Sequence, residues 1–178
     1  GQGHGVVFGV IMGTGVGAGI VFNGRLHQGL QHIAGEWGHN TLEGDGPACY
    51  CGQHGCIETL ISGTGLAADY HRHGGTDSVT AHAIAALAVQ DDAVAELAMQ
   101  RFLDRFGRAL AMVINILDPD AIILGGGLSH IERLYTEGRE RVSHYVFNDE
   151  FITPILKNRH GDSSGVRGAA QLWRSDEI

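Results

Sequence analysis

The stretch GEWGHNTLEGDGPACYCGQHGCIE, residues 35–58, contains every cysteine of this 178-residue chain. The cysteines are spaced Cys49-x-Cys51-x4-Cys56, and His39 lies ten residues before the first of them. Thiolate sulfur and imidazole nitrogen are the ligands that Zn²⁺ prefers, and a structural zinc ion takes four of them. The stretch therefore predicts a structural zinc site held by His39, Cys49, Cys51 and Cys56.

Two alternatives concern the same stretch. His54 competes for the fourth position, but it falls in the short loop between Cys51 and Cys56, where it has little freedom to turn inward. A disulfide would leave one thiol over, and no secretory signal peptide is visible to favour oxidation. We therefore expect zinc, and a reduced cytoplasmic environment for the thiols.

The composition excludes several classes of protein. Hydrophobic content of 43% and charged content of 18% are typical of a globular chain with one core and room for a small subdomain. The net charge is −8 and no basic cluster occurs, which argues against a nucleic-acid-binding surface. The longest apolar run is well short of the 18 or more residues that a membrane span requires.

The remaining pattern predicts alternating strands and helices. Val6–Met12 is β-branched and typical of a buried strand, and Asn23-Gly24 between apolar runs indicates a hairpin. Further strands are expected at residues 20–22, 25–28, 121–124 and 152–156. Helices are expected at residues 66–73, 79–89, from the acidic start Asp91-Asp92 to about 117, 129–144, and after the loop 160–165 up to Trp173. This order predicts an α/β fold with a mixed sheet and helices on both faces.

Glycine-rich loops follow three of the predicted strands, at residues 13–19, 125–127 and 160–165. Open α/β sheets bind ligands at the carboxyl ends of their strands, and unhindered backbone N–H groups can hold phosphate oxygens. A nucleotide across the first two loops is the simplest interpretation. Taken separately, each of these two loops is equally compatible with a tight turn of small residues.

The pattern Glu36-x-x-His39 followed by CYCGQHGCIE, residues 49–58, resembles the ROK family, which comprises bacterial sugar kinases, related repressors and proteins of unknown role. The segment GTGVGAG at residues 13–19 resembles the phosphate-binding loop of that family, and residues 118–127 resemble its adenosine-side element. The residues of the motifs GEWGHN, CYCG, ISGTG, NILDPD and HGDSSGVRGAA are most similar to those of the manno-fructokinase branch. The N-acetylglucosamine kinases are the nearest neighbour of that branch.

The resemblance implies a ribonuclease-H-like, actin-type ATPase lobe with a small zinc-binding subdomain at residues 35–58. It implies ATP-dependent phosphorylation of a hexose, with fructose as the expected substrate, to the hexose 6-phosphate, with ATP and Mg²⁺ as cofactor and a homodimer formed through this lobe. The sugar would be held by Glu36, His39 and Glu58, two of which would otherwise be interpreted as surface carboxylates. The implied nucleotide-binding residues are Gly13, Thr14, Gly15, Gly17, Gly125, Gly126 and Gly127.

Two elements of the family pattern do not occur in residues 1–178. They are the catalytic aspartate of an Asn-Asp-Ala-Asn segment and the first phosphate loop, Asp-x-Gly-Gly-Thr. We therefore expect residues 1–178 to form the C-terminal lobe of a ROK kinase, with the base in an N-terminal lobe that precedes Gly1. The alternative is the sugar-sensing part of a ROK repressor, whose DNA-binding helices would also precede Gly1. The intact glycine loop favours the kinase.

Overall fold

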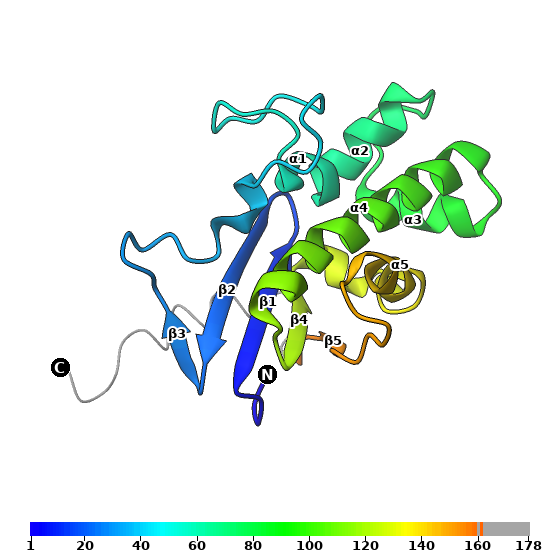
Figure 1. The fold of residues 1–178 in the computed structure, drawn as a ribbon. Coiled ribbons are helices and arrows are strands. Elements are labelled where there is room, and N and C mark those ends of the chain that lie inside the picture. The colour runs from blue at the N-terminus through cyan, green and yellow to red at the C-terminus, as the bar shows by residue number, and fades with distance from the viewer. Residues whose placement is uncertain (160, 162–178) are drawn as a thin grey trace.

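The computed structural model describes residues 1–159 and residue 161, and five strands within them form one mixed sheet (Figure 1). The strand order is β3-β2-β1-β4-β5. Strands β1, β2 and β3 pair antiparallel, whereas β4 pairs parallel with both β1 and β5. The bounds are β1 Val6–Met12, β2 Val16–Phe22, β3 Arg25–His27, β4 Ala121–Gly125 and β5 Ile155–Lys157.

Helices α2, α3 and α4 begin at residues whose side chains satisfy free backbone N–H groups. Ser62, Thr80 and Asp92 each accept a hydrogen bond from the amide three residues further on, and so cap α2, α3 and α4. Helix α4 ends at Asp118, which is left-handed and precedes Pro119. The bounds are α1 Ile57–Ile61, α2 Gly63–Arg72, α3 Ala81–Val89, α4 Ala93–Leu117 and α5 Glu137–Tyr145, with 3-10 turns η1 Glu36–His39, η2 Gly127–His130 and η3 Glu132–Leu134.

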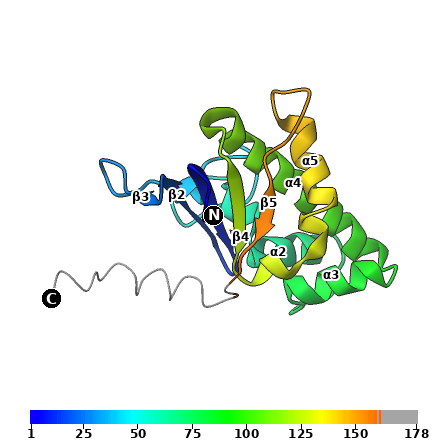
Figure 2. The same cartoon turned by 90° about the horizontal axis from the view of Figure 1, so that it is seen from below.

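The core lies between these helices and one face of the sheet. Alternate residues of β1, namely Phe8, Val10 and Met12, are buried, whereas Ile11 between them is 49% exposed. Helix α4 supplies the opposite wall of the core with Phe102, Phe106 and other buried apolar residues. Figure 2 shows α3, α4 and α5 on the same side of β4 and β5. The parallel pairing of β1 with β4 places the carboxyl ends of these two strands side by side, with Ile11 opposite Gly125.

The predicted fold class is confirmed as a mixed α/β fold of the actin-type ATPase kind. The described helices cover one face of the sheet. The loop at residues 160–165, apart from Gly161, and the helix predicted up to Trp173 lie outside the described residues. No helix in the described part of the chain is long and apolar enough to cross a membrane.

Several predicted boundaries were wrong. The loop expected over residues 13–19 ends at Gly15, because Val16 already pairs with Met12 as the first residue of β2. The helix expected at residues 129–144 is divided into η2, η3 and α5, since Ile131 is extended and Thr136 is not helical. Helix α1 was not predicted, and β5 is shorter than expected, beginning directly after Pro154.

Candidate functional site

Four side chains of the segment 35–58 meet in a cluster whose ligand atoms all lie within 4.8 Å of one another: His39, Cys49, Cys51 and Cys56. The Nδ1 atom of His39 lies 3.6 Å from the Sγ atom of Cys49, and the Sγ atoms of Cys51 and Cys56 are also 3.6 Å apart. Ligands about 2.0–2.3 Å from a tetrahedral zinc ion are separated by about 3.3–3.8 Å. The cluster therefore fits zinc, and His54 is exposed outside it.

The backbone between the cysteines turns at two left-handed glycines. Gly52 has φ 89° and donates its N–H to the Cys49 carbonyl at 3.0 Å, while Cys49 donates its own N–H to the Gln53 carbonyl at 2.8 Å. Gly55 has φ 60°, and a Cβ there would overlap the Glu43 carbonyl. Only glycine fits both conditions at this position, so Gly55 brings Cys56 back toward the first two sulfurs.

The pKa values of two of the cysteine thiols, Cys51 and Cys56, are shifted in opposite directions. The backbone hydrogen bond from Gln53, opposed by partial burial and assisted by the neighbouring thiols, lowers the pKa of Cys51 to about 7. Burial, together with hydrogen bonds to Cys51 and Cys49, raises the pKa of Cys56 to about 12. Without a cation the cluster therefore retains at least one thiol proton at neutral pH, and a metal that binds thiolates must displace it.

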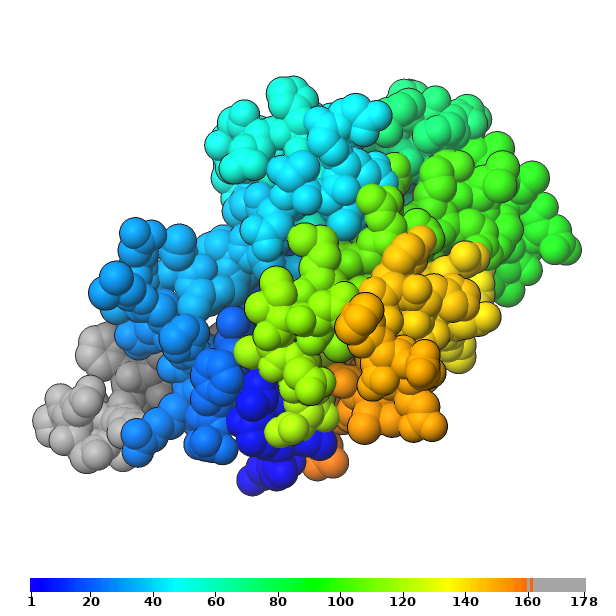
Figure 3. Space-filling view, in the orientation of Figure 1, coloured from blue at the N-terminus to red at the C-terminus, as the bar shows by residue number. Residues whose placement is uncertain are grey.

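An ion-pair network joins this segment to the helices. Glu43 accepts hydrogen bonds from Arg105 at 2.9 Å and Arg108 at 3.2 Å, both on α4. Arg105 also donates to Asp69 of α2 at 2.9 Å, and Arg101 donates to the same carboxylate at 2.8 Å. Figure 3 shows the segment as a cyan projection beside α2. The projection is therefore held to α4 by ion pairs of partly buried charges.

The predicted sugar-binding residues lie next to the metal cluster. Glu36 and His39 lie on η1, and Glu58 lies on α1, directly after Cys56 and Ile57. The Oε2 atom of Glu58 accepts the backbone N–H of Val16 at 2.8 Å. A Cβ at Gly15 would collide with that carboxylate. Glu58 therefore connects the cysteine segment to the turn between β1 and β2.

Tyr50 is a further residue of this site that the sequence reasoning did not assign. Its hydroxyl lies 2.9 Å from Nε2 of His39, and the two rings meet edge to face with centroids 5.0 Å apart. The sequence could have indicated Tyr50, because it lies between Cys49 and Cys51. A residue between two clustered cysteines is held close to the other residues of the cluster.

A cavity of about 480 Å³ opens where β1 and β4 end. Helices α2 and α3 both begin at it, and none of its lining residues is acidic. The positive ends of two helix dipoles and a lining without carboxylates suit an anionic ligand such as a phosphate chain. The lining residues are Gly13, Thr14, Gly63, Thr64, Ala67, Thr80, Ala81, His82, Gly127 and Leu128.

The turn that forms one wall of this cavity is held by α2. Gly63 donates its N–H to the Gly13 carbonyl at 2.7 Å, and the Thr64 hydroxyl donates to the Thr14 carbonyl at 2.8 Å. His82 of α3 lies 3.0 Å from the Gly127 carbonyl through its Nε2 atom. Both glycine segments are therefore held against a helix start, and together they surround the same cavity.

The predicted nucleotide-binding residues divide into two groups. Gly13, Thr14 and Gly127 line the cavity. Gly126, with φ 75°, lies behind the lining, where a Cβ would overlap the Met12 carbonyl. The others that do not line the cavity are Gly15, Gly17 and Gly125, of which Gly17 is a strand residue of β2. Residues 63–64 and 80–82 were not predicted, although ISGTG at residues 61–65 is part of the resemblance.

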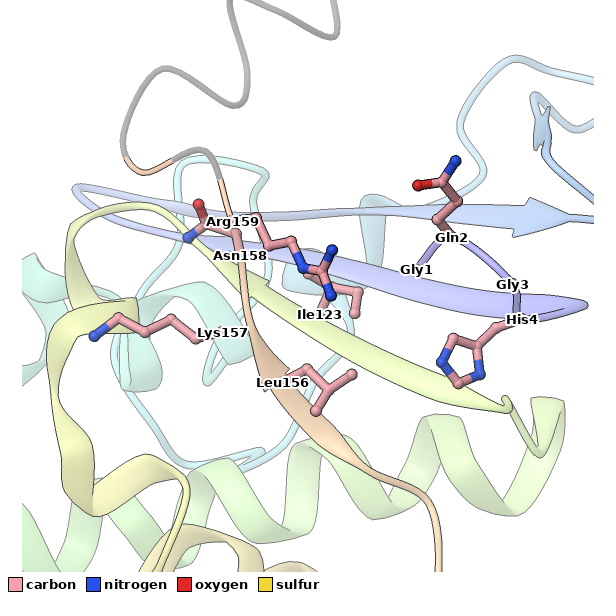
Figure 4. A pocket seen from close by; sticks show the side chains of 9 residues that line it. All are labelled: Gly1, Gln2, Gly3, His4, Ile123, Leu156, Lys157, Asn158 and Arg159. Atoms are coloured by element: carbon pink, nitrogen blue, oxygen red, sulfur yellow. The ribbon is translucent and has the colours of Figure 1, made fainter.

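A second cavity, of about 530 Å³, lies away from these groups, between the first residues of the chain and strands β4 and β5 (Figure 4). None of the predicted site residues lines it. Its lining residues are Gly1, Gln2, Gly3, His4, Ile123, Leu156, Lys157, Asn158 and Arg159.

The mixed sheet, the cavity at its strand ends and the His/Cys cluster define an actin-type ATPase fold with an added segment whose ligand set fits a metal ion. The ROK family model matches residues 1–176, and the chain belongs to the ROK family.

Individual relatives include both enzymes and a regulator. An N-acetyl-D-glucosamine kinase of Escherichia coli O1:K1 is 39% identical over 181 residues, covering 96% of this chain and 59% of the relative. The ROK family glucokinase from Streptomyces griseus, in complex with glucose and AMPPNP, superposes with a TM-score of 0.87 at 29% identity, over 96% of this chain and 61% of that one. A ROK family transcriptional regulator, a homologue of the E. coli MLC protein, superposes with a TM-score of 0.77 at 26% identity, over 93% of this chain and 45% of that one. The chain therefore spans about 59% of the length of the curated relatives it matches.

Proposed function

We propose that this chain is the C-terminal lobe of a kinase that transfers phosphate from ATP to a hexose or a 2-acetamido hexose. The observation that carries the proposal is the 2.8 Å hydrogen bond from the Val16 amide to Glu58. It places a carboxylate suited to sugar hydroxyls against the turn whose other end lines the cavity suited to phosphates. The names of the related N-acetylglucosamine kinase and glucokinase support the same reaction class.

In this proposal the sugar lies against η1 and α1. The carboxylates of Glu36 and Glu58 accept hydrogen bonds from its hydroxyls, and Nε2 of His39 donates one. Zinc, held by His39 and the three cysteines, would supply rigidity by fixing the ring of His39 through Nδ1. Together these residues hold the acceptor hydroxyl of the sugar in a fixed position relative to the phosphate cavity.

The nucleotide occupies the other side of the turn. The N–H of Thr14 and the positive N-terminal ends of α2 and α3 hold the phosphates, and Mg²⁺ enters with ATP. The sugar hydroxyl attacks the γ-phosphorus, the bond to the β-phosphate oxygen breaks, and ADP leaves. The hydroxyl proton passes to a base that we place in an N-terminal lobe, since none of the residues assigned here accepts it.

The preferred hexose is a finer question. The residues of the loop motifs favour fructose, whereas the relatives described above are an N-acetylglucosamine kinase and a glucokinase. We keep fructose as a proposal to be compared directly with those two sugars by kcat/KM in the complete protein. A homodimer through this lobe is likewise a proposal, to be measured by sedimentation at micromolar concentration.

Gly13→Ala should weaken Mg-ATP binding at least about 10-fold without lowering the melting temperature. A Cβ at Gly13 meets no atom within 4 Å, so the fold accepts it, but it enters the cavity wall where phosphate oxygens would approach. One hydrogen bond lost to a charged group is worth about 1.5–3 kcal/mol. Isothermal titration of the complete protein with Mg-ATP measures the effect.

Gly17→Ala is the matched control for this experiment. A Cβ at Gly17 also meets nothing within 4 Å, but Gly17 belongs to β2 and does not line the cavity. We expect its affinity for Mg-ATP to be unchanged. Equal losses in the two variants would show that the cavity is not the phosphate site.

The 178-residue chain alone should release no ADP above background when supplied with Mg-ATP and fructose, glucose or N-acetylglucosamine. Loss of a general base typically lowers the rate by about 10²–10⁴-fold, and loss of the opposing lobe removes much of the positioning as well. A coupled ADP-release assay checks this. Turnover at an ordinary kinase rate would place a base within residues 1–178, with Asp162, which lies outside the described residues, as the first candidate.

The alternative function is the sugar-sensing part of a ROK repressor, supported by the structural similarity to the regulator. A pure sensor needs the sugar cradle but not the phosphate cavity. Binding of hexose without any binding of Mg-ATP in the complete protein would favour the repressor over the kinase.

A further inference from the structure

We propose that Tyr50 is an exchangeable occupant of the sugar site. Its phenol oxygen accepts the Nε2–H of His39 while no sugar is bound, and a sugar hydroxyl takes its place on binding. The inference rests on the proposed function, in which Nε2 of His39 faces the sugar.

The proton position on His39 follows from its two contacts. Nδ1 faces the cysteine cluster, 3.6 Å from Sγ of Cys49, whereas Nε2 lies 2.9 Å from the Tyr50 hydroxyl. A metal ligand must present a free lone pair, so a ring bound to the metal through Nδ1 carries its proton on Nε2. The Tyr50 oxygen is then the acceptor. The single hydrogen that His39 has available for a ligand is therefore already engaged by Tyr50.

The surroundings of Tyr50 are those of the proposed sugar cradle. The phenol of Tyr50 lies close enough to Glu58 and Glu36 to interact electrostatically with both carboxylates. Glu36 and Glu58 are the two other residues assigned to the sugar. A protonated phenol and a sugar hydroxyl have the same hydrogen-bonding capacity, one donor and two lone pairs. A sugar hydroxyl can therefore replace the phenol bond for bond.

The exchange requires little rearrangement. Tyr50 is 84% exposed, and it contacts His39 through the hydrogen bond and through edge-to-face packing of the two rings. Its neighbours Cys49 and Cys51 hold the backbone at the cluster, so rotation about the Tyr50 side-chain bonds suffices to move the ring aside. The sugar must therefore break about one ordinary hydrogen bond, which corresponds to about 2- to 10-fold in affinity.

Tyr50→Phe in the zinc-loaded complete protein should lower the Kd for the sugar by about 2- to 10-fold, because the competitor is removed. Fructose, glucose and N-acetylglucosamine are titrated calorimetrically, and zinc content is measured in the same samples and should not change. The matched control is Tyr145→Phe, whose hydroxyl donates to Asp104 at 2.7 Å and is not part of the cluster. It should leave both quantities unchanged.

Histidine-selective ¹⁵N NMR of the sugar-free protein provides a second readout. We expect His39 to be protonated at Nε2, and Tyr50→Phe to shift that resonance while Tyr145→Phe does not. An unmoved resonance would overturn the proposal even before sugar is added. Weaker or equal sugar binding by Tyr50→Phe would overturn it as well, as would loss of zinc, which would make Tyr50 a support of the metal cluster only. If the unmodified protein binds none of the three sugars, the proposed function itself fails.

Discussion

Cys56→Ser is expected to abolish stoichiometric zinc binding and to loosen the segment 35–58. Cys56 is fully buried, its sulfur lies 3.6 Å from the Cys51 sulfur, and it is also the N-cap residue directly before α1. Structural zinc sites bind with about 10–16 kcal/mol, so one of four ligands is worth about 2.5–4 kcal/mol, or about 10²–10³-fold in affinity. Metal analysis and titration against a chelator measure the loss.

His54→Ala is the matched control for the zinc prediction. His54 belongs to the same short loop but is exposed and outside the cluster. We expect one zinc ion per chain in this variant and in the unmodified protein. The ligand assignment would be refuted by metal loss in His54→Ala, or by retention of normal zinc affinity in Cys56→Ser.

Asp69→Asn should lower the free energy of unfolding by about 2–3 kcal/mol at pH 7. The Asp69 carboxylate is only 4% exposed and accepts from Arg101 and Arg105, which are 30% and 14% exposed. Removing one partner of a buried ion pair typically costs about 3–5 kcal/mol, and the partial exposure of both arginines places this case lower. Urea unfolding with saturating zinc in every sample measures the difference.

The stabilisation by Asp69 should disappear in acid. Burial opposes ionisation, but hydrogen bonds from Arg101 and Arg105 outweigh it and lower the pKa of Asp69 below its usual value. A carboxylate whose pKa is depressed by folding contributes stability above its unfolded pKa of about 4 and loses it as the pH falls toward the folded pKa. The stability gap between Asp69→Asn and the unmodified protein should therefore be constant from neutral pH to about pH 5 and close below about pH 4.

Asp77→Asn is the control for this network. Asp77 is 80% exposed and pairs with His71, itself 60% exposed, so we expect little change in the free energy of unfolding. A loss in Asp77→Asn as large as that in Asp69→Asn would contradict the assignment of the effect to the buried network.

Local chemistry explains why much of the fold was predictable. The strand Val6–Met12 and the long helix ending before Pro119 follow from β-branched composition, helical spacing and a residue that cannot continue the ladder. Boundaries set by tertiary contacts were missed. Gly17 has no side chain from which a strand could be predicted, and it is recognised as a strand residue only by its pairing with Ile11.

The site was predictable to the extent that its residues are close in sequence. The four cluster residues lie within 18 positions and their chemistry is restrictive. Thr64 and His82 reach the cavity only because α2 and α3 start beside the β1–β2 turn, which no local pattern indicates. The contact of Glu58 with Val16 spans 42 positions and likewise required the folded chain.

The parallel pairing of β1 with β4 also constrains the order in which the lobe assembles. Val7 pairs with Ala121, 114 residues later, whereas the hairpin closes with Met12 opposite Val16, four residues away. The chain entropy of loop closure makes the long pairing about 3 kcal/mol more expensive. The metal cluster needs only residues 39–56. All four residues of the His/Cys cluster are therefore synthesised before α4 and β4, so the cluster requires none of the long-range strand pairing.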